Sequence, residues 1–142
     1  MNYRQEENGR YLISLDIGDE IIESLTEFAD SAGVASGQFT GIGALDSAEL
    51  GYFDNEKREY LRKKIEGQRE ILSLIGNLAA GPGGEPILHA HIILGDPDFR
   101  LSGGHLFSGR ISVTGEIYFR PTSDLERTPN SETGLNLWNL ER

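Results

Sequence analysis

The chain has 142 residues, 37% hydrophobic and 25% charged, which is the length and composition of one folded domain. It has no cysteine, which excludes disulfide scaffolds, thiol nucleophiles, iron–sulfur clusters and cysteine zinc fingers. With 13 basic and 23 acidic residues, the formal net charge of -10 repels phosphate backbones and anionic lipids at long range. No apolar stretch approaches the ~18–20 residues of a membrane span. Because Met1–Asn8 also lacks a signal-peptide pattern, we expect a cytoplasmic protein without a membrane partner.

One strand and one amphipathic helix are predicted near the start of the chain. Tyr11–Asp16 has the pattern of a strand, and Gly18 and Asp19 then open a helical segment. The apolar residues of that segment recur at the spacing of one helix face: Ile21, Ile22, Leu25, Phe28 and Ala29. Gly33 is typical of a helix C-terminus.

Short strands separated by glycine-rich turns are predicted from there to Arg120. The expected strands are 38–42, 48–53, 59–65, 70–78, 86–94, 106–107 and 111–119, with turns at 54–55, 81–84 and 95–98. One main helix with many antiparallel-type strands predicts an α+β domain built on a mixed, mostly antiparallel β-sheet. The lack of strand–helix alternation disfavours a doubly wound nucleotide-binding fold.

The C-terminal segment, residues 121–142, differs from the core of the domain, which we place at about 11–120 within a single domain 1–142. Pro121 and Pro129 break regular patterns there. Its apolar residues are Leu135, Leu137, Trp138 and Leu140. We therefore expect this segment to dock on the domain or on a neighbouring subunit.

All three histidines of the chain lie between positions 89 and 105. His89 and His91 are two apart in a predicted strand, so their side chains point to one face, with Cα atoms about 6.5–7 Å apart. His105 follows Gly103 and Gly104, which allow close backbone approach, and would face the pair if the connection is a hairpin. Three imidazoles can hold zinc and leave one coordination position open. Spacing alone leaves open the alternative of ordinary surface or core histidines.

Five motifs follow one another within a resemblance that runs from about Tyr11 to the C-terminus: Gly41–Leu45, Ala48–Phe53, Glu70–Leu78, Leu88–His91 and Gly103–Leu106. In this order they resemble the plants-and-prokaryotes conserved (PPC) domain family. The resemblance implies a mixed sheet with one helix, a homotrimer, and a metal, usually taken as zinc, at a trio like His89, His91 and His105. It further implies a stand-alone prokaryotic protein of the kind labelled predicted DNA-binding.

Two features of the plant proteins that this chain resembles are altered or missing. Plant members carry an AT-hook, but this sequence has no Arg-Gly-Arg-Pro core. A plant motif tied to partner recruitment, Gly-Arg-Phe-Glu-Ile-Leu, corresponds here to Gly-Gln-Arg-Glu-Ile-Leu at 67–72. We therefore do not expect plant-type recruitment.

Five basic residues form a candidate DNA-binding patch, which a trimer would present three times: Lys57, Arg58, Arg62, Lys63 and Lys64. The interleaved carboxylates of Glu56, Glu59 and Glu66 cancel much of its field. The pattern favours the solvated face of a hairpin over a DNA contact.

These observations predict a homotrimeric zinc-binding protein with a regulatory or ligand-sensing role, whose partners are its own copies and either a small-molecule ligand or DNA. One alternative is a zinc-dependent enzyme acting on a small molecule, because zinc lowers the pKa of bound water to about 7. Glu49, Glu70 and Glu116 are its candidate bases. Another alternative is direct DNA binding. The sequence leaves open the fourth metal ligand and whether one subunit or two supply the histidines.

Overall fold

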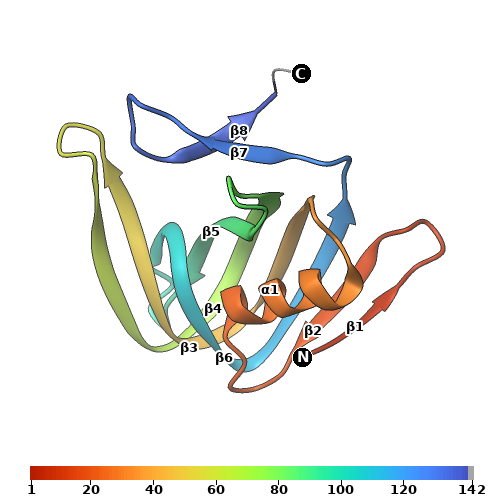
Figure 1. The fold of residues 1–142 in the computed structure, drawn as a ribbon. Helices are drawn as coiled ribbons and strands as arrows, with labels where there is room; N and C mark the ends of the chain where they lie inside the picture. Colours follow the sequence, from red (N-terminus) through yellow and green to blue (C-terminus); the bar gives the residue numbers. More distant parts are fainter. Residues whose placement is uncertain (141–142) are drawn as a thin grey trace.

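Long antiparallel strands make up most of the molecule, and the computed structural model describes residues 1–140 (Figure 1). The elements in chain order are β1 (Asn2–Gln5), β2 (Tyr11–Leu15), α1 (Ile21–Ala32), β3 (Gly37–Asp54), β4 (Glu59–Ala80), β5 (Pro86–Gly95), β6 (Leu101–Pro121), β7 (Glu126–Pro129) and β8 (Asn136–Asn139). The expected main helix and mostly antiparallel sheet are confirmed, and the pairing of β4 with β7 is parallel. Within residues 1–140, no helix has the length and apolar character needed to cross a bilayer.

β3, β4 and β6 are longer than the sequence predicts because each runs through a predicted break. β3 joins the expected strands 38–42 and 48–53, β4 joins 59–65 and 70–78, and β6 joins 106–107 and 111–119. The β3–β4 ladder shifts register between Gly41 and Gly43 and again between Leu45 and Ser47. Such bulges bend a strand without ending it. The glycine and polar residues that indicate turns in the sequence therefore mark bends in the structure.

Four of the strands close into a ring. The sheet has the order β1-β2-β6-β3-β4-β7-β8, and β5 pairs with both β4 and β6. β3 also pairs with both β4 and β6, so each strand of the ring has a partner on either side. Ring closure pairs the second half of β5, from His91 to Gly95, with a strand on each side.

The helix α1 covers one face of the sheet (Figure 1). Ile21, Leu25 and Phe28 are buried on the side of α1 that faces the core. The carboxylate of Glu20 caps the helix by accepting the backbone N–H of Glu23 at 2.7 Å. Gly33 ends the helix in the left-handed conformation, as the sequence predicts.

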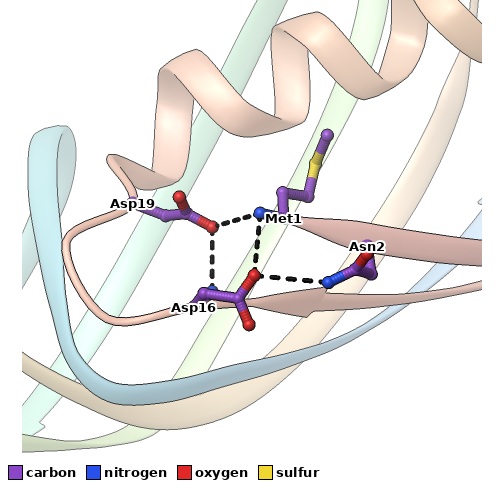
Figure 2. A network of polar contacts seen from close by, with 4 residues as sticks. All are labelled: Met1, Asn2, Asp16 and Asp19. Atoms are coloured by element: carbon purple, nitrogen blue, oxygen red, sulfur yellow. Dashed lines mark hydrogen bonds and ion pairs between the residues drawn. The ribbon is translucent and has the colours of Figure 1, made fainter.

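The short strand β1, which no sequence pattern predicts, is fastened to the loop before α1. The amino nitrogen of Met1 lies 3.0 Å from an Asp16 carboxylate oxygen and 2.8 Å from one of Asp19 (Figure 2). The same oxygen of Asp19 accepts the backbone N–H of Asp16 at 2.8 Å. These contacts raise the pKa of the amino group and lower that of Asp19. All four residues of β1 are exposed, so β1 lacks the apolar alternation that signals a strand.

The strands β7 and β8 form a hairpin that lies across one end of the sheet (Figure 1). A parallel bridge joins Ala80 of β4 to Glu126 of β7. The Ser36 hydroxyl accepts the backbone N–H of Leu125 at 2.9 Å. This segment thus returns to its own chain, where the side chain of Trp138 stays 49% exposed.

Candidate metal centre

The hairpin of β5 and β6 brings the three histidines together. His89 and His91 alternate with the buried Ala90 along β5, which sends both imidazoles to the same face. The connection to β6 is a hairpin, and His105 lies directly opposite His91 in the ladder. All three side chains come from one chain.

The spacing of the imidazoles fits a metal ion. Their candidate ligand nitrogens all lie within 4.8 Å of one another, and Nε2 of His89 is 3.2 Å from Nε2 of His91. Tetrahedral zinc with bonds of about 2.0–2.1 Å places its nitrogen ligands about 3.3 Å apart. The nitrogens of His89 and His91 already have nearly this separation. Three protein ligands would leave one position open.

Burial favours the neutral imidazole, which is the form that binds metals. The pKa of His105 is lowered to about 4, first by burial and then by His89, His91 and Arg62. The pKa of His89 is lowered by burial and then by Arg127 and His91. Nδ1 of His105 is buried and has no hydrogen-bond partner among the described residues. A buried nitrogen without a partner costs free energy, and a metal bond to this ring would offset part of that cost. The residues present therefore fit a metal ion.

Two glycines of β6 allow the strands to lie close beside the histidines. A Cβ atom on Gly103 would lie 2.6 Å from the carbonyl oxygen of Ile92, and one on Gly104 would lie 2.6 Å from that of Gly51. Real side chains do not tolerate such contacts with backbone. The close approach that the sequence predicts at these two positions is confirmed.

Aromatic side chains form one wall of the site, and no sequence pattern marks them. The ring of His105 lies 4.9 Å from that of Tyr60 and 4.7 Å from that of Phe107, between centroids. The guanidinium of Arg62 lies 3.7 Å from the centre of the Phe107 ring. Burial raises the pKa of Tyr60, so its hydroxyl stays protonated at neutral pH.

A pocket of about 390 Å³ lies beside His89, and the aromatic side chains around His105 do not line it. It is lined by Asn77, His89, Arg127, Leu137 and Trp138. An adjoining pocket of about 420 Å³ contains His89 and His91 together with Asn77 and Trp138. Among the described residues, no acidic side chain lines either pocket. A further pocket of about 480 Å³ lies away from the histidines, over β1, β2 and β6.

The five residues of the basic patch are divided between two faces of the β3–β4 hairpin and its turn. Arg62 and Lys64 alternate with Lys63 along β4, so Lys63 points to the opposite face. Arg62 pairs with a carboxylate of β3 at 3.5 Å, and Lys57 pairs with Asp54 at 3.8 Å. Arg58 lies in the turn with a positive φ of 55°. The structure therefore does not gather these charges into one cationic surface.

The candidate catalytic carboxylates lie elsewhere. Glu49 pairs with Arg62 at 3.5 Å and lines a separate pocket that also contains Lys64. Glu116 lines the pocket over β1 and β2, and Glu70 lies on β4 opposite Gly95. None of the three lines the pockets beside the histidines.

Comparisons with known proteins agree with this arrangement. A structure from Bacteroides thetaiotaomicron, named a "putative DNA-binding protein", has a TM-score of 0.93 and 32% identity over 99% of this chain and 98% of its own. A metal-containing protein of Archaeoglobus fulgidus has a TM-score of 0.86 and 35% identity over 98% and 99%. A plant- and prokaryote-conserved protein of Pyrococcus horikoshii has a TM-score of 0.86 and 32% identity over 99% and 96%.

No curated protein matches the sequence. The family model of the Plants and Prokaryotes Conserved domain matches residues 3–122, which contain the ring of strands and all three histidines. The chain belongs to the Plants and Prokaryotes Conserved domain family.

Proposed function

We propose that the protein is a homotrimeric zinc-binding protein whose histidine site senses a ligand in a regulatory role. The arrangement of His89, His91 and His105 carries this proposal, because their ligand nitrogens lie within 4.8 Å on one rigid hairpin. A set of three imidazoles suits zinc among the metals that proteins commonly bind. The relative from Archaeoglobus fulgidus, 35% identical, is named a metal-containing protein, which supports metal binding by this chain.

Zinc bound at the histidines would supply a Lewis acid with one open coordination position. The chain's own residues orient the imidazoles on paired strands and keep two of them neutral by burial. The pockets lined by His89 would let a ligand approach the histidines. Among residues 1–140, no carboxylate lines these pockets to serve as a general base, and this favours ligand binding over the hydrolytic alternative.

The first test is the metal content of wild-type protein and of His91→Ala, both purified without an affinity tag. We expect about one zinc per chain in the wild type and none in the variant. Lys63→Ala is the matched control, because Lys63 is exposed on β4 outside the site, and it should retain the metal. Wild-type protein that holds no zinc even after zinc is added would refute the proposal.

Exposed apolar side chains support the homotrimer. Ile75 lies opposite His91 in the ladder and is 55% exposed, and Ile93, two residues beyond His91, is 46% exposed. An apolar surface beside a polar site is typical of an interface between copies. Light scattering should show one species near three times 15.7 kDa. Ile75→Lys should dissociate it, and a wild-type monomer would refute this part of the proposal.

Direct DNA binding is the second candidate, because the Bacteroides relative carries that name. The divided basic patch and the net charge of -10 weigh against it. On this alternative, duplex DNA should bind at low salt, weaken steeply as salt rises, and dissociate on charge reversal of Lys63 and Lys64. Absence of binding at low salt would dismiss it.

A further inference from the structure

Arg127 of β7 is a buried cation that forms no ion pair within residues 1–140. Arg127 is only 4% exposed. Its guanidinium donates hydrogen bonds to Oδ1 of Asn77 and, at 3.0 Å, to the carbonyl oxygen of Asn136. Its Nε has no partner, and no carboxylate of residues 1–140 forms an ion pair with it. A buried guanidinium paired only with neutral acceptors is held at a free-energy cost that an anion would offset.

Asn77 joins this cation to the histidines. On β4 it lies directly opposite His89 of β5, and its Oδ1 accepts the hydrogen bond from Arg127. His89 and Arg127 therefore flank one residue and line the same pocket. Since Oδ1 of Asn77 is engaged, its Nδ2 amino group is the donor left for a bound molecule.

The hairpin of β7 and β8 supplies the apolar side of this pocket. Leu137 and Trp138 line it, and Trp138 also lines the adjoining pocket that holds His91. The indole is 49% exposed, so it offers free surface to a flat molecule. Its lining among residues 1–140 contains no acidic side chain, so the pocket combines the positive charge of Arg127 and the amide donor of Asn77 with an apolar wall.

We propose that this pocket binds a small organic carboxylate with a flat apolar body, its carboxylate paired with Arg127 on the histidine side and its body against Trp138. The inference rests on the proposed ligand-sensing function and extends it by naming the class of ligand. A carboxylate is the planar anion that a guanidinium binds best, and a metal at the histidines would add a second positive charge.

The test uses the fluorescence of Trp138, which is the only tryptophan of the chain. Benzoate is titrated into zinc-loaded and zinc-free protein, and benzamide serves as its uncharged analogue of nearly the same shape. We expect saturable binding of benzoate and at least about tenfold weaker binding of benzamide, because the neutral amide loses the charge-assisted hydrogen bonds. This comparison uses unaltered protein and so does not depend on how a variant folds.

A near-isosteric variant tests the role of Arg127. Asn77→Asp places a permanent carboxylate beside the guanidinium, and we expect the affinity for benzoate to fall at least about tenfold while the zinc content is unchanged. Asn55→Asp, in the turn between β3 and β4, is the matched control with the same change in charge and should bind benzoate like the wild type. Thermal unfolding verifies that both variants fold.

The outcomes separate this inference from the proposed metal site. Equal binding of benzoate and benzamide, unchanged binding by a folded Asn77→Asp variant, or no response to benzoate in protein that contains zinc would each overturn the carboxylate pocket. Protein that holds no zinc but distinguishes benzoate from benzamide would uphold the pocket and refute the metal site. Protein that holds one zinc per chain but does not respond to benzoate would uphold the metal site and refute the pocket.

Discussion

Replacement of His105 by phenylalanine should remove a pH-dependent part of the stability of the zinc-free protein. In the folded chain the pKa of His105 is lowered from 6.5 to about 4, first by burial and then by His89, His91 and Arg62. Between these two values the unfolded chain binds more protons than the folded chain, so acidification favours unfolding. The contribution of neutral His105 is fully present above about pH 6.5 and is lost as the pH falls towards 4.

The structure sets the size of this effect. A shift from 6.5 to about 4 corresponds to an upper limit of about 3 kcal/mol, at about 1.4 kcal/mol for each pH unit. The ring is only partly buried, so water screens it and reduces the expected loss to about 1–2 kcal/mol. A phenyl ring at this position keeps the packing against Tyr60 and Phe107.

Urea unfolding of both proteins, freed of metal with a chelator, measures the effect between about pH 7 and pH 4.5. Every other titratable group is present in both the wild type and His105→Phe. The difference between the free energies of unfolding of these two proteins therefore isolates the contribution of His105. We expect the wild type to lose about 1–2 kcal/mol more than His105→Phe over this range. Parallel pH profiles would refute the reasoning, because they would mean that folding does not perturb the pKa of His105.

Three further substitutions test the scaffold around the site. Gly104→Ala places a Cβ atom 2.6 Å from the carbonyl oxygen of Gly51, so urea unfolding should show a loss of about 1–3 kcal/mol, accompanied by weaker zinc retention. Glu20→Ala removes the helix cap at 2.7 Å and should lower stability by about 1–2 kcal/mol in thermal unfolding without changing the zinc content. Ser36→Ala leaves the part-buried N–H of Leu125 without its 2.9 Å acceptor and thereby loosens β7, so benzoate binding should weaken while zinc binding persists.

The helix and the histidine hairpin are predictable because their patterns are local. The apolar spacing that begins at Ile21 predicts where α1 starts, and Gly33 predicts where it ends. Both positions lie within a few residues of the observed ends. His89 and His91 share a face because every strand alternates, whatever its neighbours are. The turn signal after Gly95 is equally local, and it places His105 on the adjoining strand.

The length of the strands is not a local property. β4 continues from Glu59 to Ala80 because β3 supplies partners along almost all of its length, and β5 adds partners on the other side of its second half. Glycine and polar residues near positions 42–47 indicate a break between two strands in the sequence. In the structure β3 is paired with β4 and β6 on either side of these residues, which form bulges. Only the tertiary arrangement determines whether such residues end a strand or bend it.

The burial of Arg127 is the least predictable feature of the site. Its partner Asn77 lies 50 residues earlier in the chain, and the polar segment around it offers no alternation that marks a strand. An arginine in such a segment is ordinarily exposed. The guanidinium becomes buried only because the β7–β8 hairpin returns to the end of β4.

The two halves of the candidate site thus depend on different parts of the fold. The histidines belong to one local hairpin of the closed ring, in which His91 lies directly opposite His105 and His89 is paired with β4. Arg127 and Trp138 reach them on a hairpin joined to the sheet by a single bridge at Ala80, by the contacts of Ser36 and by the hydrogen bond from Arg127 to Asn77. Metal binding should therefore be robust, whereas recognition of the ligand depends on the more weakly attached element. Movement of β7 and β8 would alter the pocket without disturbing the metal, which is an arrangement suited to reporting the presence of a ligand.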